Sequence, residues 1–386
     1  MAQAQRGRGE EPVAPLPDDS PGDARPWLPT EDDPSVPRVN PDSGAGNSPD
    51  LPRIAVSPVT LRDLTALRGL DPLFRLNQPD AQLAPYSSLR AGIAAVLPGA
   101  RRRRPVFVAF AGDRLVGFAE FRPVLPDERW VLLALGHSVG VFAADPVWEA
   151  LLAHGVRAAG LRGVRRLFLR TPVGAAYIPA LRRLGWLPYA TETVFAAYDL
   201  TGTAGAWVPR PQRAADTWAI HQLYNGVTPR SVQDTEAWTS HRWDLRPPTM
   251  RRGVSVAGWL MDDGHHLVGY GRVSSRHRTH LIELVNHPDY SALLPDLIGG
   301  VVATLPNQAR RRVYCAVRAY QPELARRLEE HGFAPIVEQE LHVKYTTVSV
   351  RSTVPETALF HVEVRDNVPR RVPTFLHRKT GDASLE

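Results

Sequence analysis

The chain has 386 residues, of which 43% are hydrophobic and 22% charged, and its formal net charge at pH 7 is +6. These values are typical of a globular protein, and a chain of this length favours two or three domains. No stretch approaches the ~18–20 apolar residues of a membrane span, and the N-terminus lacks the charged-then-apolar pattern of a secretion signal. We therefore expect a cytoplasmic protein with no membrane partner.

Cysteine, histidine and arginine usage argues against several kinds of site. Cys315 is the only cysteine, which excludes an internal disulfide, and its apolar surroundings VYCAV predict a buried strand thiol rather than a nucleophile. His265 and His266 are adjacent, but no cysteine pair accompanies them at zinc spacing, so no metal is expected. The basic run from Arg101 to Arg104 has no interleaved aromatic residues, which favours a solvated loop over nucleic-acid binding.

The chain begins with a proline-rich segment, residues 1–53, that has almost no periodic apolar pattern. Such a segment cannot bury enough surface to offset its ordering entropy, so we expect a disordered tail. A first domain is expected over 54–200. Its predicted elements, in order, are a strand at 54–59, a helix at 61–70, an irregular region to Ala100, a hairpin at 106–121, a central strand at 130–136, a helix after Asp145-Pro146, a strand at 165–172, a helix through Leu181 and a strand at 193–200.

Residues 201–211, rich in glycine and proline, are expected to link this domain to a second one over 212–350. The second domain repeats the order of elements. They are a helix at 213–224, a hairpin at 254–274 turning at Asp263-Gly264, a central strand at 280–285, a helix from Leu293, a strand at 311–317, a helix at 323–332 and a strand at 338–348. Residues 351–386 form a tail to which the pattern assigns no element.

Two pairs of segments indicate that the second domain is a duplicate of the first. Residues 181–198 and 328–345 share a glycine-aromatic pair and a closing tyrosine, which are Gly185-Trp186 with Tyr198 and Gly332-Phe333 with Tyr345. Upstream, LVGFAEFRP at 115–123 matches LVGYGRVSS at 267–275. Each pair is separated by about 150 residues, a domain-sized interval rather than that of a short solenoid repeat.

The order of elements, with the glycine-aromatic pair before the last strand, resembles the GCN5-related N-acetyltransferase (GNAT) superfamily in two tandem copies. The most specific segment is LIELVNHPDY at 281–290, which is similar to the central strand and V-x-P-x-Y phrase of that family. The resemblance implies an α/β (α+β) fold in which each copy is a mixed, mostly antiparallel sheet flanked by helices. It also implies that the fourth strand splays from the fifth, that acetyl-CoA or another acyl-CoA binds in the resulting V, and that the acyl group passes to an amine of a small molecule or peptide.

In the family, the cofactor pyrophosphate is bound by backbone N–H groups of an arginine- and glycine-rich loop at the start of the next helix. The matching positions here, and thus the candidate cofactor-binding residues, are Leu284, Val285, Asn286, Ser291 and Ala292. However, Ser291 follows Tyr290 directly, so the loop itself is missing. The first copy keeps Gly136 and Gly140 but has Val141-Phe142 where glycines are expected. We therefore expect that neither copy has the phosphate loop.

Acetyl transfer also needs a base for the incoming ammonium and an acid for the leaving thiolate. Glu283 is the candidate base, because it interrupts an apolar strand and burial would raise its pKa toward neutral. The open alternative is that strand alternation points this side chain to solvent at the sheet edge. The first copy has only Leu133-Ala134-Leu135 at this position, and so lacks a base.

The tyrosine that serves as acid in many family members is replaced in both copies, by Leu181 and Leu328. Tyr320 is the candidate substitute in the second copy, and Tyr177 occupies a similar place in the first. For both, a packing aromatic is the alternative.

Two interpretations of function stay open. One is a divergent N-acyltransferase that holds acyl-CoA by other contacts. The other is a non-catalytic GNAT-fold module that binds a ligand or protein, or regulates. The missing loop favours the second, since several charge-assisted hydrogen bonds of about 1.5–3 kcal/mol each would be absent, while the resemblance favours the first only by analogy. Nucleic-acid binding through the basic surface is a third, less favoured interpretation.

Overall fold

The computed structural model describes residues 54–68, 70, 74–77, 79–83, 87–97, 104–124, 129–138, 144–198, 200, 209–245, 253–305 and 311–346. Both predicted tails, most of the predicted linker and Arg101 to Arg103 lie outside these residues.

The first half follows the predicted order of elements closely. Its elements are β1 (Ile54–Pro58), α1 (Leu64–Leu67), β2 (Phe74–Arg75), the 3-10 turn η3 (Asp80–Leu83), α2 (Ser88–Val96), β3 (Val106–Ala111), β4 (Arg114–Val124), β5 (Arg129–His137), α3 (Ala144–Gly160), β6 (Arg166–Pro172), α4 (Ile178–Arg183) and β7 (Leu187–Tyr198). The region before Ala100 that was expected to be irregular contains β2, η3 and α2. Ser87 caps α2 by accepting a hydrogen bond from the Arg90 N–H group.

The second half repeats this order. Its elements are β8 (Arg210–Pro211), α5 (Thr217–Val227), α6 (Arg230–Glu236), the 3-10 turn η6 (Ser240–Trp243), β9 (Ser255–Asp262), β10 (Leu267–Arg276), β11 (Thr279–Asn286), the 3-10 turn η7 (Pro288–Leu293), α7 (Leu294–Ala303), β12 (Arg312–Arg318), α8 (Pro322–Glu330) and β13 (Ala334–Tyr345). Both predicted hairpins are confirmed, as β3–β4 and β9–β10.

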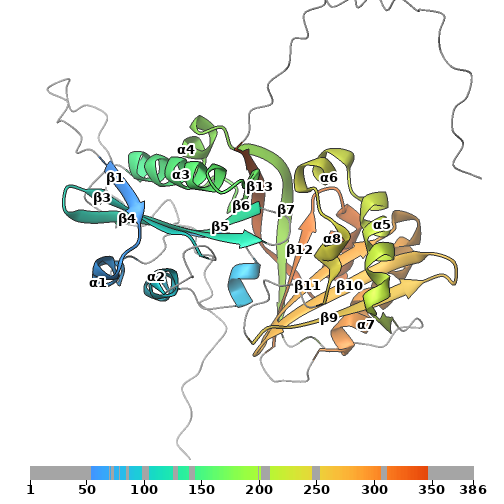
Figure 1. The fold of residues 1–386 in the computed structure, drawn as a ribbon. Coiled ribbons are helices and arrows are strands. Elements are labelled where there is room, and N and C mark those ends of the chain that lie inside the picture. The colour runs from blue at the N-terminus through green and yellow to red at the C-terminus, as the bar shows by residue number, and fades with distance from the viewer. Residues whose placement is uncertain are drawn as a thin grey trace, which may run out of the picture. The chain divides into compact units, whose positions relative to one another are not determined.

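The described strands form one 13-stranded sheet in the order β1-β3-β4-β5-β6-β13-β7-β12-β11-β10-β9-β8, with β2 paired to β5. Among the described strands, only β5–β6 and β11–β12 pair in parallel, so the predicted mixed, mostly antiparallel sheet is confirmed. In the first half, α3 and α4 cover one face of the sheet, while α1 and α2 lie on the other (Figure 1). Each face has its own core, one around Leu151 and Phe121 under α3, the other around Leu67 and Phe118.

The last strand of each half pairs with the other half. Strand β7 lies beside β12, with Tyr198 opposite Arg312, and β13 lies beside β6, with Tyr345 opposite Arg166. The two exchanged strands also pair with each other at the centre of the sheet, where Gln339 is opposite Glu192. The two predicted domain ranges stay a prediction, and within the described residues their strands form one continuous sheet.

The repeated glycine-aromatic pairs have the same local structure. Gly185 and Gly332 adopt positive φ angles of 71° and 82°, which glycine tolerates best. In both of these glycine-aromatic corners, the backbone N–H group of the aromatic residue donates to a leucine carbonyl. The bonds run from Trp186 to Leu181 and from Phe333 to Leu328, at 3.0 Å each. These bonds close the ends of α4 and α8 and direct both aromatic rings into the cores.

Candidate functional site

The V-shaped splay implied by the family resemblance is present in both halves. Strands β5 and β6 pair in parallel only from Arg129 opposite Arg166 to Val131 opposite Phe168, although both strands continue beyond this point. Strands β11 and β12 behave in the same way, with pairing that ends at Ile282 opposite Cys315.

The first V is filled by the chain itself. The Leu76 N–H group donates to the Leu133 carbonyl at 3.3 Å, on the β5 side. The Asn77 N–H group donates to the Arg170 carbonyl, and Asn77 Oδ1 accepts from the Arg170 N–H group, both at 3.0 Å on the β6 side. Asn77 Nδ2 donates to the Leu132 carbonyl. One asparagine therefore bridges the two splayed strands and uses the backbone groups that face the gap.

Replacing Asn77 by alanine should lower the free energy of unfolding by about 2–4 kcal/mol, because a buried carbonyl and a buried N–H group each lose a partner. Asn77 also has a positive φ angle of 60°, so Asn77→Gly separates backbone strain from the lost hydrogen bonds. In urea denaturation, Asn77→Gly should show most of the decrease in the free energy of unfolding that Asn77→Ala shows. If both variants unfold at the same urea concentration as the unmodified protein, the bridge that Asn77 makes across the first V does not stabilise the fold.

In the second copy, η7 occupies the position where the family resemblance would place the phosphate loop. Several of its N–H groups already have acceptors within the chain. The Asp289 N–H group donates to His287 Nδ1 at 3.4 Å, the Tyr290 N–H group to the His287 carbonyl at 3.0 Å, and the Leu294 N–H group to the Ser291 carbonyl. A phosphate at this helix start would therefore compete with acceptors of the chain itself for these N–H groups.

Carboxylates also surround this helix start. Asp289 lies in the first turn of η7 and Asp296 in the first turn of α7, where each complements the positive end of the helix dipole. Asp263 accepts a hydrogen bond from the Tyr290 hydroxyl at 2.6 Å. The charge at this position is therefore opposite to that of a phosphate site.

The five predicted cofactor-binding residues lie on β11 and η7. Leu284 and Val285 are buried, and Asn286 Nδ2 donates to the His287 carbonyl at 2.7 Å, while Ser291 and Ala292 belong to η7. Their role stays a prediction. In the first copy, a Cβ on Gly136 would lie 2.1 Å from the Phe118 ring, so packing explains that glycine. Gly140, Val141 and Phe142 lie outside the described residues.

Glu283, the predicted base, is held by an ion pair. Arg242 Nη2 lies 2.7 Å from Oε1 and 2.8 Å from Oε2, and 34% of the Glu283 side chain is exposed. Burial acts to raise the pKa of Glu283, but Arg242 and Arg272 outweigh it, so the pKa is lowered. The prediction of a raised pKa is therefore wrong, because the sequence did not indicate these partners. The side chain lines a cavity rather than pointing away from the protein at the sheet edge.

The two candidate acids differ in their surroundings. Tyr320 follows β12 and lines the same cavity as Glu283, and burial raises the pKa of its hydroxyl. Tyr177 is fully buried, bonds to the Thr171 hydroxyl and packs edge-on against Trp148. Tyr177 is thus a packing aromatic, and Tyr320 is the tyrosine of the two that a ligand in the cavity would meet. Leu181 and Leu328 are both fully buried.

The cavity has a volume of about 380 Å³ and is lined by both halves. Its arginines are Arg122, Arg129, Arg170, Arg242, Arg272 and Arg318. Its carboxylates are Asp80, Glu192, Glu236 and Glu283. Aromatic side chains, Phe168, Tyr189, Tyr224, Trp238, Trp243 and Tyr320, add apolar surface.

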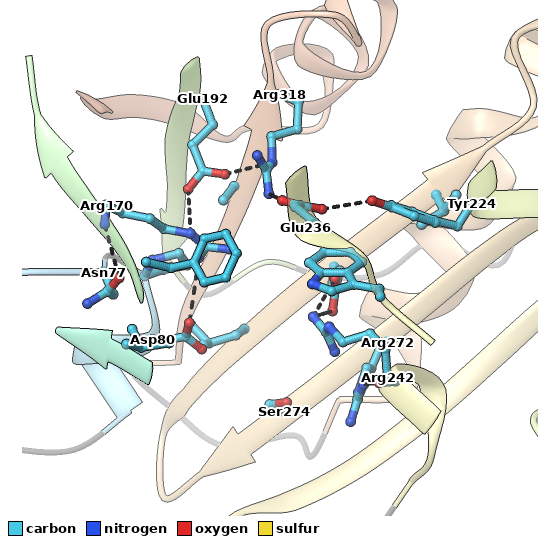
Figure 2. A pocket seen from close by; sticks show the side chains of 18 of the residues that line it. Asn77, Asp80, Arg170, Glu192, Tyr224, Glu236, Arg242, Arg272, Ser274 and Arg318 are labelled. Carbon is cyan, nitrogen blue, oxygen red and sulfur yellow. Dashed lines mark hydrogen bonds and ion pairs between the residues drawn. The ribbon is translucent and has the colours of Figure 1, made fainter. Parts of the chain in front are cut away.

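A chain of ion pairs connects the halves along one side of this cavity (Figure 2). Arg170 lies 3.5 Å from Asp80 and 3.3 Å from Glu192, and Arg318 lies 3.0 Å from Glu192 and 2.7 Å from Glu236. These five residues come from η3, β6, β7, β12 and α6. They were not predicted from the sequence, although charged residues within buried strands were a signal that could have identified Glu192 and Arg318.

The other side of the cavity is dominated by two arginines and two indoles. The Arg242 guanidinium lies 4.8 Å from the Trp238 ring centre and 5.4 Å from that of Trp243. Arg272 donates to the Arg242 carbonyl at 2.7 Å and to the Asp244 carbonyl at 3.0 Å. Burial, and then Arg242, lower the pKa of Arg272.

No helix among the described residues is long and apolar enough to cross a membrane. No group of three or more histidine, cysteine, aspartate or glutamate side chains in this part of the chain is arranged to hold a metal ion.

No protein-family model matches the sequence, and no curated protein does. Solved structures do align. A GCN5-related N-acetyltransferase from Sphaerobacter thermophilus aligns over 79% of this chain and 98% of its own, with 14% identity and a TM-score of 0.48. A tandem GNAT protein from the clavulanic acid biosynthesis pathway covers 77% and 100%, with 15% identity and a TM-score of 0.45. A GCN5-related N-acetyltransferase from Anabaena variabilis covers 76% and 73%, with 12% identity and a TM-score of 0.43. These structures carry the name of the superfamily that the sequence resembles, and the likeness concerns the fold.

Proposed function

We propose that the protein is a GNAT-fold binding module that takes up a small molecule in the central cavity and does not transfer acyl groups from acyl-CoA. The observation that carries this proposal is the bridge made by Asn77 across the first V. The space where the family resemblance would put the cofactor is occupied there by the chain's own hydrogen-bonded segment.

The second half supports the same conclusion by a different route. Its helix start carries Asp289 and Asp296 in place of a phosphate loop. Glu283 has a lowered pKa and is bound to Arg242, which makes it a weak base for an incoming ammonium. The residues present therefore do not fit acyl-CoA.

The cavity itself supports a binding role. Ligand pockets usually measure about 300–1,000 Å³ and combine apolar walls with a few polar groups, and this cavity of about 380 Å³ has both. The cytoplasmic location predicted from the sequence is part of this proposal.

Acyl transfer in the second half, from acyl-CoA to a small-molecule or peptide amine, is the alternative. It is favoured by one observation, that Glu283 and Tyr320 line the same cavity.

A thermal-shift titration with CoA and with acetyl-CoA distinguishes the two. A bound ligand raises the melting temperature with its concentration, and we expect no rise with either compound at millimolar concentration. An acetyl-CoA-dependent GNAT enzyme serves as the positive control. A concentration-dependent rise would overturn the proposal, and a loss of turnover in Glu283→Gln with binding retained would then establish the alternative.

A further inference from the structure

One charged side chain of the central cavity, that of Arg272, donates its described hydrogen bonds to backbone carbonyls and not to a carboxylate. Arg170, Arg242 and Arg318, by comparison, form ion pairs with carboxylates of the cavity. Because a charge in a partly desolvated cavity is costly unless it is compensated, Arg272 points to a ligand of negative charge.

The position of Arg272 in the sheet explains why it has no carboxylate partner among its described hydrogen bonds. Its strand partner in the sheet is Glu283 on β11, the nearest available carboxylate by register. Both oxygens of Glu283, however, accept hydrogen bonds from Arg242. Arg272 instead donates to two backbone carbonyls, which carry only partial charges, and the residue is 5% exposed. A buried guanidinium thus lines the cavity with no carboxylate hydrogen-bonded to it in the described contacts.

The wall next to this charge is apolar. Trp238 and Trp243 lie against Arg242, and Val285 on β11 and Val254 before β9 also line the cavity. Figure 2 shows Arg242 and Arg272 on the same side of the cavity, away from the chain of ion pairs that includes Glu192 and Glu236. A ligand placed there would meet positive charge and aromatic surface together.

We propose that the cavity binds a small organic carboxylate whose anionic group accepts hydrogen bonds from Arg272 and Arg242 and whose apolar body packs beside Trp238. The inference rests on the proposed function, since it names the ligand class of the same cavity. Guanidinium groups match carboxylate and phosphate geometry equally well. A carboxylate is favoured because it brings one negative charge to the one guanidinium of Arg272, and because an organic carboxylate has an apolar body that can pack on the adjacent indoles, which inorganic phosphate lacks.

Isothermal titration of the full chain with four probes tests this inference. They are phenylacetate, its neutral analogue phenylacetamide, its cationic analogue phenethylamine, and inorganic phosphate. We expect phenylacetate to bind at least about tenfold more tightly than the other three, the factor expected for charge-assisted hydrogen bonds. Equal binding of phenylacetamide, preference for phenethylamine or phosphate, or no binding of any probe would overturn the inference.

Two variants locate the subsite. Arg272→Gln should weaken phenylacetate binding by at least about tenfold, while Arg230→Gln, an exposed arginine of α6, should bind like the unmodified protein. Equal binding by both variants would also overturn the inference. If Arg272→Gln does not fold, the charge preference of the unmodified protein decides alone. The CoA titration is run in parallel. Failure of the carboxylate inference without CoA binding leaves the proposed function intact, whereas CoA binding overturns the proposed function whatever phenylacetate does.

Discussion

Replacing Arg318 by methionine is expected to lower the free energy of unfolding by about 3–5 kcal/mol, the usual cost of breaking a buried ion pair by removing one partner. Arg318 lies between Glu192 and Glu236, whose side chains are 1% and 3% exposed. In the variant, Glu192 keeps its ion pair with Arg170. The Glu236 carboxylate keeps only neutral donors among its described side-chain contacts, the hydroxyls of Tyr189 and Tyr224. Most of the lost stability should therefore come from the unpaired charge of Glu236. Urea denaturation measures the loss.

Two comparisons make this result specific. Adding Glu236→Gln to Arg318→Met removes the stranded charge and should recover part of the stability. Arg326→Met removes an arginine from the exposed salt bridges of α8, with Glu323 and Glu330, and should cost no more than about 1 kcal/mol. An Arg318→Met protein as stable as the Arg326→Met protein would show that the chain of ion pairs does not stabilise the fold.

The position of this chain of ion pairs explains why a large loss is expected. Asp80 and Arg170 come from the first half, and Arg318 and Glu236 from the second. Glu192 lies between them on β7, the strand that pairs with β12 of the second half. The Glu192 carboxylate also accepts a hydrogen bond from the Gln339 side chain at 2.7 Å. Breaking the ion pairs would weaken the junction between the halves as well as one wall of the cavity.

The sequence predicted the elements that depend on local patterns. Turn residues such as Asp263-Gly264 indicated the hairpins, and the glycine-aromatic pairs at Gly185 and Gly332 indicated the duplication, because each signal lies within a few residues. The exchange of β7 and β13 was not predicted. Each of these strands carries a tyrosine that pairs with an arginine, Tyr198 with Arg312 and Tyr345 with Arg166. Because the copies are alike, the sequence does not distinguish pairing within a half from pairing between halves.

In the candidate site, too, the sequence indicated a residue from its local pattern but did not indicate its distant partners. Glu283 was identified because it interrupts an apolar strand, and it does line the cavity. Its pKa was predicted with the wrong sign, since the residue that determines it, Arg242, lies 41 positions away in a 3-10 turn. Asn77 was missed for a similar reason. It lies outside any regular element, and its function as a bridge depends on the splay of two strands far along the chain.

Replacing Trp186 by alanine should lower the free energy of unfolding by about 3–5 kcal/mol, the range measured when large aromatic residues are removed from protein cores. Trp186 is 1% exposed and belongs to the core under α3. The cavity left by its indole cannot close by a small shift, because the Gly185 corner holds the backbone by a hydrogen bond from Trp186 to Leu181.

Trp186→Phe is the matched control, because the duplicated corner of the second half holds Phe333 in the equivalent position. The indole Nε1 has no hydrogen-bond partner among the described residues, so phenylalanine loses volume but no hydrogen bond. Trp186→Phe should lower the free energy of unfolding by about half as much as Trp186→Ala, or less. Chemical denaturation of both variants measures the difference. If Trp186→Phe destabilises as strongly as Trp186→Ala, the two corners are not interchangeable, and the duplication preserves the backbone of the corner without preserving the packing of its core.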